Sequence, residues 1–178
     1  MVDTVEKHSP LHELALPHVG GDAVTLSHRL AESLVQVQAW PDALKQVEKQ
    51  LQGLKDVQLM PAGPGRWLIE ADKPGLEDKL RKSLPADQAA VTGLTHARVV
   101  VSIRGEKAEW ILASGIAIDF SEGAFAVGST QLSHHHEIGL TIHRTGADSF
   151  DLYVFTSLVR SFWHWIEKAS GEVGYSVE

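Results

Sequence analysis

The pattern that constrains the fold most strongly lies in residues 150–170, which read FDLYVFTSLVRSFWHWIEKAS. Residues 150–155 are aromatic and aliphatic around one aspartate, as in a strand. Thr156 and Ser157 follow, and either residue type can cap a helix. Beyond them the apolar residues recur at helical spacing and occupy an arc of roughly 160° when placed at 100° per residue. The stretch therefore predicts a strand followed by an amphipathic helix that ends near Gly171.

The apolar arc of this closing helix is wider than a single core stripe. Trp163 and Trp165 lie at its two edges, so one can pack inside while the other meets a partner. Tryptophan is enriched at the energetic centres of protein interfaces. The alternative is that both rings simply cover the core of their own domain. We name Trp163 and Trp165 as candidate partner-contact residues and keep that alternative open.

The same reading of apolar periodicity and of turn residues extends over the rest of the chain. Helices are expected at 41–53, where Leu44, Val47 and Leu51 form one buried stripe, at 74–84 and at 106–114. Strands are expected at 34–37, 57–59, 67–69, 98–104, 131–135, 138–144 and 150–155. The order is β-α-β-β-α followed by β-α-β-β-β-α, which predicts an α+β fold whose two similar halves hint at an internal duplication. Residues 1–23 are expected to form an irregular arm, and residues 24–178 a single domain.

Composition excludes several classes of function. The chain has 178 residues, with 16 Lys and Arg against 23 Asp and Glu, and the net charge of −7 disfavours nucleic-acid partners. It has no cysteine, which rules out disulfides, thiolate metal sites and cysteine nucleophiles. No stretch approaches the ~18 apolar residues that a membrane span requires. We therefore expect a cytoplasmic protein without a membrane partner.

The histidine-rich sequence at residues 134–136 is the strongest candidate for chemistry. His134 and His136 share one face of the expected strand, since side chains alternate, and His143 on the adjoining strand is a possible third metal ligand. The alternative is a set of solvated or half-buried histidines, and we assign no metal site. No catalytic or cofactor-binding residue is assigned either. Asp119, Asp148 and Asp151 are expected at the ordinary surface.

Taken together, the second half of the chain resembles a known family. The residues that carry the resemblance are Gly105, Leu112, Gly115, Asp119, Phe125, Gly128, Phe150-Asp151-Leu152-Tyr153-Val154, Ser157, Phe162, Trp163, Trp165, Ile166, Ala169 and Gly174. A weaker likeness runs through Ser9-Pro10-Leu11, Val24-Thr25-Leu26 and Gly63-Pro64-Gly65-Arg66-Trp67-Leu68. These residues resemble the gamma subunit of heterotetrameric sarcosine oxidases. The run at 134–136 departs from the family pattern.

The resemblance implies a fold of duplicated β-α-β units, like the folate-binding domain of the glycine-cleavage T-protein family. It also implies an accessory, non-catalytic subunit of a flavoenzyme complex that oxidatively demethylates sarcosine or a related N-methyl amine. The alpha, beta and delta subunits would be its partners. FAD, FMN, NAD, tetrahydrofolate and zinc would be bound by those partners and none by this chain.

Two other functions remain open from the residues. One is a stand-alone folate-binding one-carbon transfer protein, which the expected fold permits by analogy. The other is a small metalloenzyme that uses His134, His136 and His143.

Overall fold

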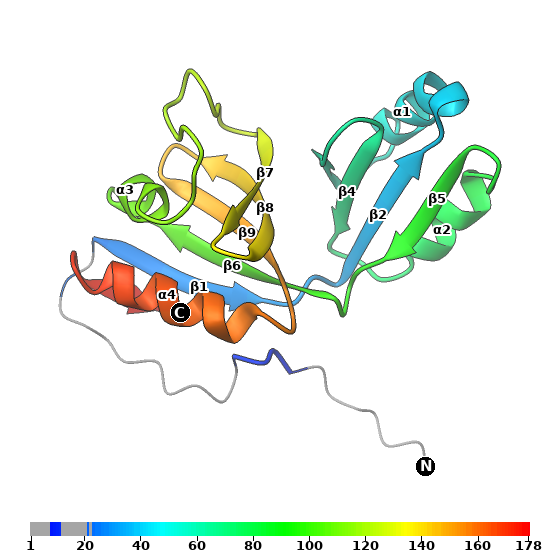
Figure 1. The fold of residues 1–178 in the computed structure, drawn as a ribbon. Coiled ribbons are helices and arrows are strands. Elements are labelled where there is room, and N and C mark those ends of the chain that lie inside the picture. The colour runs from blue at the N-terminus through cyan, green and yellow to red at the C-terminus, as the bar shows by residue number, and fades with distance from the viewer. Residues whose placement is uncertain (1–7, 12–20, 22) are drawn as a thin grey trace, which may run out of the picture.

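The structure is a computed structural model, and it describes residues 8–11, 21 and 23–178. The described residues form two sheets, one of six strands and one of four, each packed against its own pair of helices (Figure 1). Most of the expected N-terminal arm falls outside these residues, so its boundary with the domain at residue 23 stays a prediction. Within the described residues no helix is long and apolar enough to cross a membrane.

The four-stranded sheet has the order β3-β4-β2-β5. Its strands are β2 (Ser33–Ala39), β3 (Gln58–Pro61), β4 (Arg66–Ala71) and β5 (Ala89–Gly93). A short 3₁₀ turn, η1 (Pro41–Ala43), leads into helix α1 (Leu44–Gln52), and helix α2 (Leu76–Ser83) connects β4 to β5. The unit β2-α1-β3-β4-α2-β5 is a split β-α-β arrangement of the ferredoxin-like kind.

The six-stranded sheet repeats this plan with two additions. Its order is β10-β1-β6-β9-β8-β7. Its elements are β1 (Val24–Arg29), β6 (Arg98–Arg104), α3 (Ala108–Ala113), β7 (Thr130–His135), β8 (Ile138–Gly146), β9 (Ser149–Phe155), α4 (Val159–Ser170) and β10 (Tyr175–Val177). The series β6-α3-β8-β9-α4-β10 follows the first unit, with β1 inserted between β10 and β6 and with β7 added at the edge. The expected duplication is therefore present in the topology.

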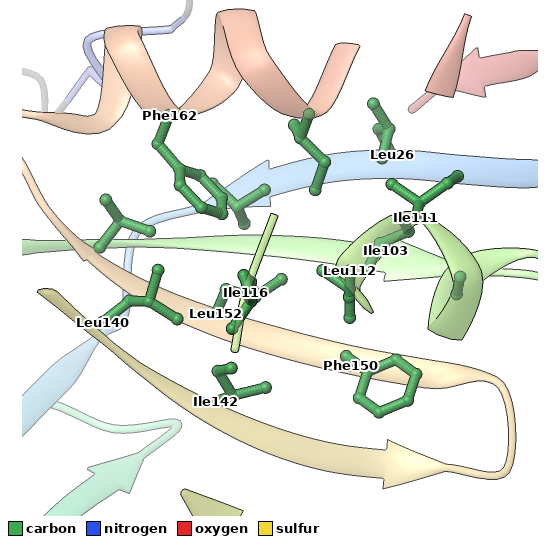
Figure 2. Close-up of a cluster of buried hydrophobic side chains, with 14 of the residues drawn as sticks. Leu26, Ile103, Ile111, Leu112, Ile116, Leu140, Ile142, Phe150, Leu152 and Phe162 are labelled. Atoms are coloured by element: carbon green, nitrogen blue, oxygen red, sulfur yellow. The ribbon is translucent and has the colours of Figure 1, made fainter. Parts of the chain in front are cut away.

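Helix α4 buries its apolar face against the six-stranded sheet. Val159, Phe162, Trp163 and Ile166 are each fully buried there. Figure 2 shows Phe162 reaching toward the sheet while Ile111 and Leu112 of α3 approach the same cluster. Among the described N-terminal residues, Leu11 is buried in this cluster, and Arg160 of α4 donates from Nε to the carbonyl of Pro10 at 3.1 Å.

The two sheets meet through a smaller apolar cluster. It comprises Ala31, Leu34, Met60, Ala62, Leu68, Val100 and Tyr153, which come from both sheets and from the segments around them. Because side chains alternate along a strand, Leu34 and Leu68 face this cluster while Val35 and Ile69 face α1 and α2. Strands β2, β4 and β6 are therefore buried on both faces.

Several local expectations differ from the structure. Strands β1, β5 and β10 were not expected, because β1 mixes polar with apolar residues, β5 is rich in small residues and β10 has three residues. Neither Thr156 nor Ser157 caps α4: Leu158 takes that position without a side-chain bond, and Thr156 Oγ1 donates to the carbonyl of His96 at 2.9 Å. Leu44 is 36% exposed rather than buried, since it lies at the first residue of α1.

Candidate functional site: a charged pocket between the sheets

The six-stranded sheet has an apolar face under α3 and α4 and a second face that carries several polar side chains. Register pairs Ser102 with Asp151 and Asp151 with His143, so these three side chains lie in a row across β6, β9 and β8. Tyr153 follows Asp151 on the same face of β9, because it is two residues further along the strand. This polar face looks toward Glu70 on β4 of the other sheet.

Arg29 is the cation that joins the two sheets. Its Nη1 donates to Oε1 of Glu70, and its Nη2 donates to Oε2 of Glu70 and to Oδ2 of Asp151, each at 3.1 Å. Burial alone would lower the pKa of Arg29, but the hydrogen bonds and charges of Glu70 and Asp151 raise it above its ordinary value. The guanidinium is therefore shared between a carboxylate of each sheet.

Two hydroxyls complete the hydrogen bonding of these carboxylates. Tyr153 donates from Oη to Oε2 of Glu70 at 2.6 Å, and Ser102 donates from Oγ to Oδ1 of Asp151 at 2.7 Å. Burial, followed by the negative charge of Glu70, raises the pKa of Tyr153 well above its usual range. The phenol is thus held protonated as a donor.

An open pocket of about 350 Å³ lies against this network. Its polar lining comes from both sheets and from the segments beside β3 and β4: Arg29, Asp56, Gln58, Glu70, Asp72, His143, Thr145, Asp151 and Tyr153. Glu70, His143 and Asp151 are each only 6–7% exposed, whereas Asp56 and Asp72 are exposed at the rim. The charged walls of the pocket are therefore buried, and its entrance is exposed to solvent.

His143 is the only histidine of the sequence candidates that reaches this pocket. Within the described residues, its one hydrogen-bond contact is long, with 3.4 Å between Nε2 of His143 and Nε2 of Gln58. Burial lowers the pKa of His143, although the charges of Asp151 and Glu70 act in the opposite direction. A neutral imidazole can accept a proton or a hydrogen bond from a molecule in the pocket.

The arrangement is suited to holding charge rather than to covalent chemistry. The guanidinium and both carboxylates are committed to one another, and the tyrosine hydroxyl donates to one of those carboxylates. Within the described residues, no group of three or more histidine, aspartate or glutamate side chains is arranged to hold a metal ion. The pocket offers acidic walls, one imidazole and one amide to a small polar ligand.

The three histidines named as possible metal ligands do not converge. His136 is not on the strand but in the turn after β7, with a positive φ of 48°, so it does not share a strand face with His134. His143 pairs with Thr130 whereas His134 pairs with Gly139, which places them four residues apart along the hairpin, roughly 13 Å. Turn geometry and register together separate the set.

The buried histidine of the run is His135. Its ring stacks on Trp165 with centroids 3.9 Å apart, and its Nδ1 lies 3.0 Å from the carbonyl of Gly115. Burial lowers the pKa of His135. A Cβ added at Gly115 would lie 2.4 Å from the Trp165 ring, so glycine is required at this close approach. The histidine run therefore serves packing at this point.

The two tryptophans at the edges of the α4 arc have different surroundings. Trp163 is fully buried, and its ring centroid lies 5.6 Å from that of His28 in an edge-to-face arrangement. Its indole is therefore not available to a partner. Trp165 is half-buried beside His135 and Phe162. The interface prediction therefore passes to Trp165 alone.

Sequence reasoning missed the residues that build the pocket. Asp151, expected at the surface, is 7% exposed, and Arg29, Glu70 and Tyr153 were not singled out. The sequence did contain an indication of this site. The polar residues alternate with apolar ones along their strands, as Asp151 does between Phe150 and Leu152, so they face the other side of the sheet. Alternation predicts a second face, but it does not reveal that another sheet covers it.

The fold is similar to that of two solved proteins. A chain of the heterotetrameric sarcosine oxidase from Corynebacterium sp. U-96 matches with a TM-score of 0.82 and 23% identity, over 94% of this chain and 96% of that chain. The glycine cleavage system aminomethyltransferase T from Bartonella henselae matches with a TM-score of 0.61 and 17% identity, over 88% of this chain and 47% of that chain. These likenesses confirm the predicted fold class.

Comparisons of the sequence show the family to which the chain belongs. No curated protein sequence matches it. The model of the sarcosine oxidase gamma subunit family matches residues 43–172, which include both helix pairs and most of both sheets. The predicted resemblance is confirmed, and the chain belongs to the sarcosine oxidase gamma subunit family.

Proposed function

We propose that this chain is an accessory subunit of a heterotetrameric sarcosine-oxidase-type complex that oxidatively demethylates sarcosine or a related N-methyl amine. The observation that carries the proposal is the family match over residues 43–172. The likeness to a chain of a heterotetrameric sarcosine oxidase, which spans nearly the whole of both chains, supports it. The partners would be alpha, beta and delta subunits, and the complex would work in the cytoplasm.

In this proposal the chemistry belongs to the partners. FAD, FMN, NAD, tetrahydrofolate and zinc would be bound there, and this chain would hold none of them. The charged groups between the sheets support that division of labour, because they are engaged with one another across the fold. This chain would contribute a surface for assembly.

Co-purification tests the assembly. The chain would be co-expressed with the genes that neighbour its own and purified through a tag on this subunit. We expect a yellow flavoprotein to accompany it with fixed stoichiometry in size-exclusion chromatography. Recovery of the tagged chain alone, under gentle conditions and with the other subunits expressed, would contradict the proposal.

Trp165 is the residue through which we propose that α4 reaches a partner. Trp165→Ala is expected to reduce recovery of the complex at least about tenfold, as interface tryptophans do when truncated. Trp40→Ala is the matched control, since Trp40 is 41% exposed and lies beside the four-stranded sheet. Equal recovery with the two variants would remove Trp165 from the interface without affecting the proposed assembly.

A stand-alone folate-binding protein is the second candidate. The fold likeness to an aminomethyltransferase T favours it, although this chain spans only 47% of that protein. Calorimetric titration of the full chain with tetrahydrofolate distinguishes the two. Saturable binding by the isolated chain would favour the second candidate, and no heat of binding would exclude it.

A further inference from the structure

The pocket between the sheets carries an excess of negative charge. Its lining includes four carboxylates, Asp56, Glu70, Asp72 and Asp151, and one guanidinium, that of Arg29. No lysine is among the described residues of that lining. Lys55, Lys73 and Lys79 line an adjoining hollow of about 190 Å³ that shares three residues with the pocket. Apart from Arg29, the positive charge near the pocket therefore lies beside it rather than within it.

The excess of negative charge includes the two buried carboxylates of the pocket wall. Glu70 and Asp151, 6% and 7% exposed, share the single cation Arg29. Among the described residues that line the pocket there is no second arginine or lysine for these two carboxylates, which is unfavourable at buried positions unless a cation approaches. The structure leaves space for that cation on the open side of the wall.

His143 supplies an independent indication of a ligand. His143 is 6% exposed and lines the pocket, and its one hydrogen-bond contact in the part of the chain that the structure describes is the 3.4 Å contact with Gln58. A buried imidazole with one weak partner has hydrogen-bonding capacity that a donor in the pocket would satisfy.

We propose that this pocket binds a small organic ammonium ion, a primary or secondary amine, between Glu70, Asp151 and His143. The volume of about 350 Å³ lies at the lower end of the range for small-molecule sites. All four oxygens of the two buried carboxylates already accept a hydrogen bond. Additional N–H donors fit such oxygens, whereas a metal ion requires several oxygens directed at one centre.

The test is titration of the full chain with n-propylammonium chloride at constant ionic strength. Binding is followed by the NMR signals of the His143 ring and by calorimetry. The expected dissociation constant is about 1 mM, in the range open to a ligand of so few atoms. 1-Propanol and sodium propionate are the neutral and anionic probes of the same length, and neither is expected to shift the His143 signals.

Three variants locate the site. Glu70→Gln removes the buried excess charge while leaving an acceptor for Tyr153, and at least about tenfold weaker binding is expected. Asp72→Asn, at the exposed rim, should weaken binding about twofold to threefold without risk to folding. Asp78→Asn is the matched control, because Asp78 is also exposed but lines a different hollow.

The result that overturns the proposal is equal response to the ammonium and to 1-propanol, or equal binding by the Asp72→Asn, Glu70→Gln and Asp78→Asn proteins. Saturable binding of Mg²⁺ or Ca²⁺ that displaces the ammonium would also overturn it in favour of a metal ion. The measurement uses the chain alone, so its failure is distinct from failure of the proposed assembly.

Discussion

The two faces of the six-stranded sheet are covered in opposite ways. One face, with Phe150, Leu152 and Ile142, is buried under α3 and α4 mainly by apolar side chains. The other face, with Asp151 and Tyr153, meets the four-stranded sheet partly through an apolar cluster and partly through the ion pair and hydrogen bond that Arg29 and Tyr153 make with Glu70. Apolar burial provides stability without directional demands, whereas the charged contact specifies which groups must meet.

The largest expected effect falls on the apolar face. Phe162→Ala removes a fully buried ring from the core under α4 and should lower the free energy of unfolding by about 3–5 kcal/mol. Urea denaturation followed by circular dichroism measures the loss. Trp110→Ala is the control, since Trp110 is 51% exposed and should lose little. A loss below about 1 kcal/mol for Phe162→Ala would mean that α4 is not held by this face.

The second largest effect is expected on the polar face, when Arg29 is replaced. Arg29→Met leaves Glu70 and Asp151 buried without a counter-charge, and breaking a buried pair in this way costs about 3–5 kcal/mol. The Arg29 side chain is 44% exposed, so solvent screening reduces the expected loss to about 2 kcal/mol. The same denaturation experiment measures it.

Arg81→Met serves as the control for the loss of an arginine. Arg81 pairs with Glu77 one turn away on the exposed side of α2, and such pairs contribute about 0.3–0.5 kcal/mol. Similar losses for the two variants would show that the network between the sheets contributes no more than a surface pair.

The smallest expected effect is a dependence on pH that belongs to the polar face. Burial lowers the pKa of His143, so below its ordinary value of 6.5 the unfolded chain binds more protons than the folded one. Stability should therefore fall as the pH decreases from about 6.5. Unfolding free energies at several pH values provide the measurement.

Two variants distinguish the contribution of His143 to this pH dependence from the contributions of other groups. His143→Gln should flatten the decline in stability below pH 6.5, while His134→Gln, at an exposed position, should leave it unchanged. His135, whose pKa is also lowered by burial, accounts for part of what remains. An identical slope in the wild-type and His143→Gln proteins would contradict the assignment.

Much of the fold was predictable because its elements are strongly periodic. The strand at 98–104 was expected at those bounds, and the helix expected at 74–84 was found as α2. Strands β1, β5 and β10 were missed because each carries at most two large apolar residues. They are stabilised by pairing with neighbours, which local pattern does not contain.

The site was much less predictable, because its members are far apart in sequence. Arg29 and Asp151 are 122 residues apart, and Tyr153 and Glu70 are 83 apart. The histidine run attracted attention by being contiguous, yet its members are divided by a turn at His136. Contiguity in sequence was a poor guide to contact in space.

The sequence by itself determined three things: the closing strand and helix at 150–170 with their aromatic face, the α+β class, and the family resemblance. Periodicity and local residue types encode them. Only the tertiary structure decided that Trp163 lies in the core, that Asp151 is buried, and that Arg29 joins the sheets. The physical reason is that a strand has two equivalent faces. Which face is covered, and by what, depends on how the two sheets pack rather than on either strand alone.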